Sequence, residues 1–142
     1  MAYLFGQFSN DDNMKKTSWE IFFKEKTIDI FTTSKQVVDI GGSLRLNLGK
    51  SNVVSNKNDW LLPYVEKVQY KVLDPVDDYN PDIIGDIHDL PFADNSVESL
   101  LCLAVLEHVH NPILAIQEMH RSLKPGGKLL IYVPFLYYYH AQ

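Results

Sequence analysis

The sequence predicts an α/β fold built on a mostly parallel sheet with helices on both faces. Short apolar runs alternate along the chain with segments of helical spacing, which is typical of strand–helix–strand units. The runs are almost continuously apolar, as strands buried on both faces are. Three of the first four strands end in an acidic residue, at Asp39, Asp74 and Asp86. Ligands of such sheets bind at the carboxyl ends of the strands, so these residues indicate where function should be sought.

The length and composition fit one globular domain over residues 1–142. The chain is 46% apolar and 12% aromatic, which excludes a disordered chain. We expect an N-terminal helical segment over 1–35 and a core over 36–135. The net charge of −5 gives no reason to expect nucleic acid or an anionic membrane as a partner.

Targeting signals are not recognisable in the sequence. The first residues, MAYLFGQFSNDD, lack the basic and the long apolar parts of a secretory signal. The apolar run LLIYVPFLYYY is too short and too polar to span a bilayer. The single cysteine, Cys102, cannot form an intrachain disulfide, which fits a reducing compartment. We therefore expect a cytoplasmic protein.

The first half of the chain contains a helix, two strands and a short second helix. Thr17 and Glu20 form a capping box that predicts a helix over about 17–33. QVVDI (36–40) and VQYKVLD (68–74) have the composition of buried strands. Between them, DWLLPYVEK predicts a short helix interrupted by its proline.

The second half contains three more predicted strands and the best-marked helix of the chain. The strands are PDIIGD (81–86), SVESLLCLAVL (96–106) and KLLIYVP (128–134). Asn111 as the N-cap and Pro112 at the first helical position predict the start of the helix. Its end is marked by a Pro-Gly-Gly sequence. We expect its buried stripe to comprise four residues at helical spacing: Ile113, Ile116, Met119 and Leu123.

The acidic strand ends suggest a nucleoside ligand. A carboxylate after the second strand can accept hydrogen bonds from both hydroxyls of a ribose, and one after the third can accept from the exocyclic amine of adenine. Gly41 and Gly42 let the backbone approach a ligand where a Cβ would clash. Each feature has a structural alternative: Asp39 can cap a turn, the two glycines can form an ordinary tight turn, and Asp74 can be a turn residue.

Several motifs of the sequence resemble those of a known protein family. VVDIGG, VLDP and the long run GDIHDLPFADNSVESLLCLAVLEHVHNPILAIQEMHRSLKPGGKLLIYVPF contain D-x-x-x-L-P-F, L-E-H-V and L-K-P-G-G in order. Over about 36–135 the chain resembles the class I S-adenosylmethionine-dependent methyltransferases, in their small-molecule, type 11-like branch. The resemblance implies a Rossmann-like doubly wound sheet of strand order 3-2-1-4-5, truncated after the fifth strand, because that family continues with a helix and an antiparallel strand pair.

The resemblance implies S-adenosyl-L-methionine as the cofactor and S-adenosyl-L-homocysteine as the product. Asp39, Gly41 and Gly42 would form the loop at the methionine part of the cofactor. The family's loop has a further glycine where Ser43 stands, and a serine fits there if its φ is negative.

The remaining implied contacts come from the ends of the next three strands. Asp74 would bind the ribose hydroxyls, Asp86 and Ile87 would hold the adenine, and Leu103 would line the pocket near the sulfonium. His108 is a candidate general base for an acceptor hydroxyl, with a structural role as the alternative. We expect no metal site, because His108 and His110 are two residues apart and such a pair does not share a helix face.

These observations predict a methyltransferase acting on an oxygen of a small molecule or of a sugar or polysaccharide precursor. PFLYYYH resembles members associated with sugar methylation. The alternative is a truncated, non-catalytic module that binds the cofactor, or a partner-dependent subunit. A dinucleotide-dependent oxidoreductase would need G-x-G-x-x-G, which GGSLRL does not supply. We expect a small-molecule or glycan acceptor, no nucleic-acid or membrane partner, and a homodimer as one way to cover the exposed sheet edge.

Overall fold

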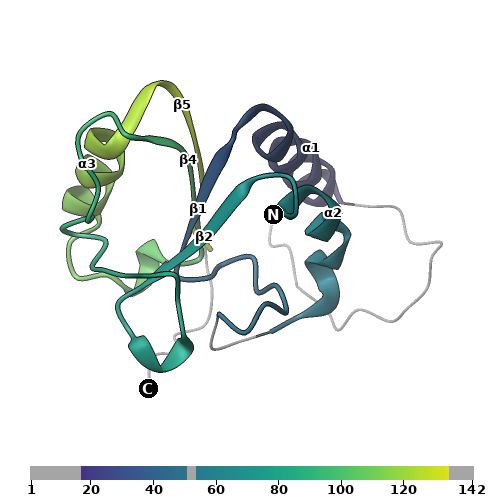
Figure 1. Ribbon diagram of the computed structural model, residues 1–142, viewed down its shortest axis with the longest axis horizontal. Helices are drawn as coiled ribbons and strands as arrows, with labels where there is room; N and C mark the ends of the chain where they lie inside the picture. Colours follow the sequence, from purple (N-terminus) through teal and green to yellow (C-terminus); the bar gives the residue numbers. More distant parts are fainter. Residues whose placement is uncertain (1–16, 51–53, 135–142) are drawn as a thin grey trace.

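A five-stranded parallel sheet forms the centre of the protein (Figure 1). The computed structural model describes residues 17–50 and 54–134. The strand order is β3-β2-β1-β4-β5, and every pairing is parallel, which confirms the predicted fold class and topology. The strands are β1 (Gln36–Ile40), β2 (Gln69–Asp74), β3 (Ile83–Ile84), β4 (Val97–Leu103) and β5 (Leu123–Tyr132). The aromatic run at 137–139, which suggested sugar methylation, lies outside the described residues.

The register brings the carboxyl ends of the inner strands level with one another. Ile40, the last residue of β1, pairs with Leu73 of β2 on one side and with Cys102 of β4 on the other. Asp74 at the end of β2 pairs in turn with Ile84 of β3. Four successive strands therefore place the residues that follow them at one edge of the sheet.

Helices cover both faces of the sheet (Figure 1). On one face lie α1 (Ser18–Thr33) and the short α2 (Leu62–Val65), and on the other lies α3 (Pro112–Ser122). The capping box predicted for α1 is present: Thr17 N donates to Glu20 Oε2 at 2.7 Å, and Glu20 N donates to Thr17 Oγ1 at 3.2 Å. These contacts satisfy backbone donors that a helix start leaves unpaired.

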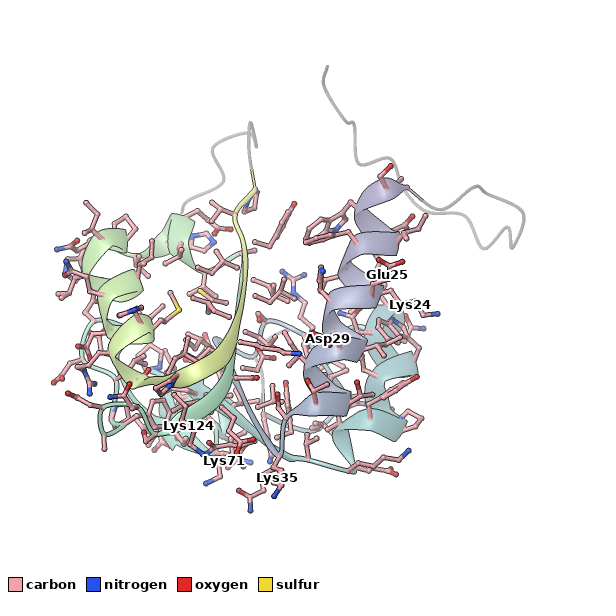
Figure 2. All side chains as sticks on the ribbon, turned by 90° about the horizontal axis from the view of Figure 1, so that it is seen from above. Lys24, Glu25, Asp29, Lys35, Lys71 and Lys124 are labelled. Carbon is pink, nitrogen blue, oxygen red and sulfur yellow. The ribbon has the colours of Figure 1, made fainter. Side chains whose placement is uncertain are left out.

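Ion pairs join α1 to β5 and connect residues at the amino ends of the strands. Lys128 of β5 donates to Asp29 Oδ2 on α1 at 2.5 Å, and Figure 2 shows Asp29 on the side of α1 that faces β5. At the amino ends of the strands, where Figure 2 labels Lys35 and Lys124, Glu98 accepts from the Lys35 backbone at 2.7 Å and from Lys124 Nζ at 3.2 Å.

The short helix predicted around Pro63 is continuous rather than interrupted. A 3₁₀ helix (Asn56–Leu61) runs directly into α2, and Pro63 lies in the first turn of α2. A proline in the first turn forfeits no intrahelical hydrogen bond, because those backbone donors have no partner in the helix. None of the helices in the described ranges combines the length and the apolar character that crossing a membrane requires.

Of the buried stripe predicted for α3, Met119 is buried as predicted, Ile113 and Ile116 are exposed, and Leu123 is the first residue of β5. Ile113 is 69% exposed and Ile116 is 44% exposed, whereas the buried residues of α3 are Ala115, Met119 and Ser122. Both sets recur at helical spacing, so periodicity alone does not choose between them. Ala115 and Ser122 have smaller side chains than Ile113 and Ile116, so burying them lets the helix backbone approach the sheet more closely.

An arginine explains how α3 is held in this rotation. Arg121 donates to the carbonyl oxygens of Leu90 at 3.0 Å and Phe92 at 2.8 Å, and to both carboxylate oxygens of Glu118. Glu118 in turn accepts from Leu90 N at 3.0 Å. The L-P-F segment is therefore fastened to α3 by hydrogen bonds that need Arg121 and Glu118 to face it.

Candidate cofactor-binding site

A cavity of about 510 Å³ lies at the carboxyl ends of the strands. Its volume is within the range of small-molecule and cofactor sites. Seven of the residues predicted from the sequence line it: Gly41, Gly42, Asp74, Asp86, Ile87, Leu103 and His108. The eighth, Asp39, is not among the lining residues. The structure thus brings together positions that are up to 67 residues apart in the chain, Gly41 and His108 being the farthest.

The two glycines make a turn that other residues would not easily make. Gly41 and Gly42 have φ of 73° and 57°, in the left-handed region that favours glycine. A Cβ on Gly41 would lie 3.0 Å from Cγ2 of Val105. The turn is tied to β2 because Gly41 N donates to the Leu73 carbonyl at 2.7 Å. The backbone at this point therefore forms part of the cavity wall.

Asp39 lies beneath this turn and holds it. Its side chain is fully buried and accepts hydrogen bonds from Ser43 N and Leu44 N, both at 2.9 Å, and from Tyr70 Oη at 2.6 Å. The Ser43 hydroxyl is a further donor to Asp39. Burial raises the pKa of Asp39, and the hydrogen bonds from Ser43, Tyr70 and Leu44 partly offset that rise. Asp39 therefore holds the loop that forms this part of the cavity wall.

The loop continues with a feature that the residue types did not indicate. Ser43 does not adopt a positive φ, so a serine is compatible with the backbone there. Arg45 instead has φ of 55°, a conformation that L side chains rarely adopt, and its backbone N–H donates to the Gly42 carbonyl at 2.9 Å. Arg45 also lines the cavity. An arginine gives no sequence signal for a left-handed backbone, so this position was missed.

Asp74 follows β2 and presents a carboxylate to the cavity. Its Oδ1 accepts from Val76 N at 2.9 Å, which fixes the orientation of the side chain. No hydrogen bond to Oδ2 comes from the residues that the structure describes. The side chain serves both as a turn residue and as an acceptor within the cavity, so the two sequence interpretations of Asp74 are compatible.

Asp86 is organised by the residue two positions after it. Asp86 Oδ1 accepts from His88 N at 2.8 Å and lies 2.6 Å from His88 Nδ1. The other ring nitrogen, Nε2, accepts from Asn111 N at 3.3 Å, so the hydrogen bonds select neutral His88 with its proton on Nδ1. The backbone and side-chain hydrogen bonds of His88 lower the pKa of Asp86. Asp86 is therefore an ionised acceptor at neutral pH.

The apolar wall of the cavity comes mainly from β4 and the segment after β3. Leu103 ends β4 and is 9% exposed, and Ile87 is 6% exposed and belongs to the core cluster on the α3 face. Ala104 follows with φ of 56°, and its N–H donates to the Tyr132 carbonyl at 2.8 Å. Cys102 lies just before it, buried, and burial raises the pKa of its thiol to about 12, so the thiol is protonated at neutral pH.

Three histidines line the same cavity: His88, His108 and His110. The His108 side chain is 54% exposed, and its Nε2 lies 3.8 Å from Glu107 Oε1. The His110 ring stacks on that of His88 with 3.9 Å between the centroids. In the described ranges, no group of three or more His, Cys, Asp or Glu side chains is arranged to hold a metal ion. His108 thus lines the cavity with a partly exposed side chain, and both ring nitrogens of His88 are engaged.

A family model and solved structures match this arrangement. Residues 64–131 match the family model described as a methyltransferase domain. A putative S-adenosyl-L-methionine-dependent methyltransferase of Methanococcus maripaludis superposes with a TM-score of 0.53 at 19% identity, covering 77% of this chain and 52% of that chain. The YcgJ protein of Bacillus subtilis gives 0.52 at 19% identity, covering 77% and 50%. These likenesses show the fold.

Curated relatives match over shorter or less similar stretches. The tRNA U34 carboxymethyltransferase of Campylobacter curvus is 26% identical over 132 residues, which are 89% of this chain and 44% of that protein. The demethylmenaquinone methyltransferase of Renibacterium salmoninarum is 47% identical over 49 residues, which are 34% of this chain and 21% of that protein. The chain thus spans less than half the length of these relatives and about half that of the solved structures.

The family match covers the segment from α2 to β5, and the solved structures share the sheet that carries the cavity. Over residues 64–131 the chain is thus similar to the methyltransferase-domain family, and its described part shares the fold of the two solved structures.

Proposed function

We propose that the chain binds S-adenosyl-L-methionine in this cavity and transfers its methyl group to an acceptor, leaving S-adenosyl-L-homocysteine. One observation carries the proposal: a left-handed glycine turn, two carboxylates and an apolar wall meet in one cavity at the carboxyl edge of the sheet. The methyltransferase-domain match over residues 64–131 gives the reaction class.

The polar and apolar groups of the cavity fit the parts of this cofactor. Asp74 has a carboxylate oxygen available for the two ribose hydroxyls, and Asp86 is an ionised acceptor for the adenine amine. Ile87 would complete the adenine subsite, and the turn at Gly41 and Gly42 would lie against the methionine part. The carboxylates of Asp74 and Asp86 also give the cavity a negative character that suits a sulfonium cation.

Methyl transfer requires few catalytic groups from the protein itself. The bound cofactor supplies a methyl group on a positive sulfur, which is a good leaving group, and positioning of the acceptor supplies much of the acceleration. His108 lines the cavity with an exposed side chain, so we propose that it accepts the proton of an acceptor hydroxyl. Leu103 would bound the site near the sulfonium.

We propose an oxygen of a small molecule, or of a sugar or polysaccharide precursor, as the acceptor. The acidic net charge of −5 disfavours a polyanionic acceptor, and among the described residues Arg45 is the one lysine or arginine that lines the cavity. The names of the relatives point to two other acceptor classes, a tRNA and a menaquinone precursor. An acceptor panel should therefore include a tRNA and a quinol beside the sugars.

The second candidate is a cofactor-binding subunit that needs a partner for activity. One structural neighbour, a putative methyltransferase of Haloferax volcanii at TM-score 0.51 and 21% identity, was solved in complex with the Trm112 methyltransferase activator. In this chain β5 pairs only with β4 among the described strands, which leaves an edge that a partner or a second copy could cover.

The test is calorimetric titration of the protein with S-adenosylhomocysteine, with NAD as the control ligand. We expect micromolar binding of S-adenosylhomocysteine and none of NAD. Turnover of labelled cofactor with the acceptor panel then separates the two candidates, because binding without turnover favours the partner-dependent subunit. Failure of S-adenosylhomocysteine to bind would overturn both.

A further inference from the structure

We propose that Tyr70 is a positioning residue for the cofactor, which it serves by holding Asp39 and, through Asp39, the loop over 41–44. The inference rests on the proposed function, because it concerns the side of the cavity that would contact the methionine part. Tyr70 contributes no atom to the wall of that cavity. Its effect has to pass through the carboxylate to which its hydroxyl donates.

The hydrogen bonds around Asp39 divide evenly between its two oxygens. Oδ1 accepts from the backbone and the hydroxyl of Ser43, and Oδ2 accepts from Leu44 N at 2.9 Å and Tyr70 Oη at 2.6 Å. The two backbone donors belong to the loop, so the position of the carboxylate sets the position of the loop. The hydroxyl of Tyr70 is the one donor of the four that comes from another strand.

Tyr70 is itself held firmly on β2. It pairs in register with Val37 of β1, and its ring lies 6.0 Å from that of Phe31 on α1. Burial, together with the neighbouring Asp39, raises the pKa of its hydroxyl above the ordinary value, so the hydroxyl is a donor at neutral pH. The strand that ends in Asp74 thereby also fixes the glycine turn.

Ser43 has a matching role on the other oxygen. A glycine at position 43 would keep the backbone donor to Oδ1 but would lose the hydroxyl donor. A buried carboxylate that loses a donor is left with a desolvated charge, and the energetic penalty is larger than for a neutral acceptor. Ser43 and Tyr70 therefore act in the same direction, and each should be needed for a well-ordered loop.

The adenine side of the cavity is built independently of this cluster. Asp86 is organised by His88 and Asn111, which make no contact with Asp39, Ser43 or Tyr70 among the hydrogen bonds of the described residues. Loss of the Tyr70 hydroxyl should consequently weaken ligands that reach the loop and leave ligands without a methionine part unaffected. A general loss of fold would weaken both kinds of ligand.

The experiment compares S-adenosylhomocysteine with adenosine as ligands of three proteins: the unsubstituted chain, Tyr70→Phe and Tyr64→Phe. Tyr64 is the matched control, because it is half-buried, packs on the same hydrophobic cluster as Tyr70, and donates no hydrogen bond from its hydroxyl to a described residue. We expect Tyr70→Phe to bind S-adenosylhomocysteine roughly tenfold more weakly, as for loss of one hydrogen bond to a buried charge. Adenosine should bind within about twofold of its original affinity, and Tyr64→Phe should change neither ligand.

Two further readouts complete the test. Ser43→Gly should weaken S-adenosylhomocysteine in the same selective way, and it replaces Tyr70→Phe if that variant does not fold. In amide spectra of Tyr70→Phe, the resonances of Ser43 and Leu44 should shift while that of His88 stays in place. Equal weakening of both ligands, or no weakening, would overturn the role of Tyr70. If the unsubstituted chain binds S-adenosylhomocysteine too weakly to measure, the proposed function itself fails.

Discussion

The glycine turn at the cavity gives a prediction that can be worked from the structure. Gly41→Ala places a methyl group 3.0 Å from Cγ2 of Val105, on a backbone with φ of 73°. The left-handed conformation costs an alanine about 1–2 kcal/mol, and a methyl group forced into packed surroundings costs about 1–3 kcal/mol more. The smaller entropy of the unfolded alanine chain returns about 0.5–1 kcal/mol. We expect a net loss of about 2–3 kcal/mol in the free energy of unfolding.

The matched control is Gly126→Ala, at a glycine in β5. Gly126 has φ of 78°, but a Cβ there would meet nothing within 4 Å. Gly126→Ala should therefore lose only the conformational part, about 0.5–1 kcal/mol. Urea denaturation, followed by circular dichroism, measures both losses on the same scale if the slope of the transition is unchanged.

The contact with Val105 can then be isolated by a double-mutant cycle. In a Val105→Ala background, the methyl group of Gly41→Ala has no Cγ2 to meet, so the effect of Gly41→Ala should fall to that of Gly126→Ala. If Gly41→Ala is no more destabilising than Gly126→Ala in the original background, the steric reasoning is refuted and only the φ requirement is left.

Four other predictions follow from the site. Asp74→Asn should bind S-adenosylhomocysteine roughly tenfold more weakly by calorimetry, because the ribose hydroxyls lose a charged acceptor. Because His88 lowers the pKa of Asp86, this carboxylate stabilises the folded state at pH values above its ordinary pKa, and the stabilisation should disappear as the pH falls through the lowered pKa. The urea midpoint should therefore fall less between pH 6 and pH 3 for Asp86→Asn than for the unsubstituted chain. Cys102 is buried, and its thiol has a pKa raised to about 12. Iodoacetamide at pH 8 should therefore label the native protein far more slowly than the urea-unfolded protein. Equal rates would contradict the buried position. His108→Gln should lower turnover once an acceptor is known while leaving the affinity for S-adenosylhomocysteine unchanged; a loss of affinity would reassign His108 to cofactor binding.

Much of the sheet could be predicted because its signals are local. QVVDI is a short apolar run that contains Asp39 near its end, and β1 covers Gln36–Ile40 as the sequence predicts. The helix starts at Thr17 and Asn111 are equally local, because each cap bonds to a residue three positions ahead. The predicted cavity residues come together because parallel strands in register end at the same edge.

The features that were missed depend on long-range packing or on backbone strain. The rotation of α3 depends on Arg121 meeting the carbonyl oxygens of Leu90 and Phe92, about 30 residues earlier, and helical spacing carries no information about that contact. The hydrogen bond from Tyr70 to Asp39 spans 31 residues and depends on the register of β2. His88 lies two residues after Asp86, and its hydrogen bond from Asn111 depends on where α3 begins.

Half of the eight left-handed residues of the described chain line the cavity. Four residues with left-handed φ line it: Gly41, Gly42, Arg45 and Ala104. For Arg45 and Ala104 a glycine would relieve about 1–2 kcal/mol of conformational strain, less the entropy that glycine loses on folding. Each is held by a backbone hydrogen bond, from Arg45 N to the Gly42 carbonyl and from Ala104 N to the Tyr132 carbonyl. Strained residues persist where the surrounding structure over-determines them, and such places are most often ligand sites. Arg45 and Ala104, which follow β1 and β4, differ in this from the left-handed Asn80 and Asn95, because asparagine adopts this conformation more readily. The backbone conformation at Arg45 and Ala104 thus supports the carboxyl ends of β1 and β4 as the ligand-binding edge without recourse to any resemblance to known proteins.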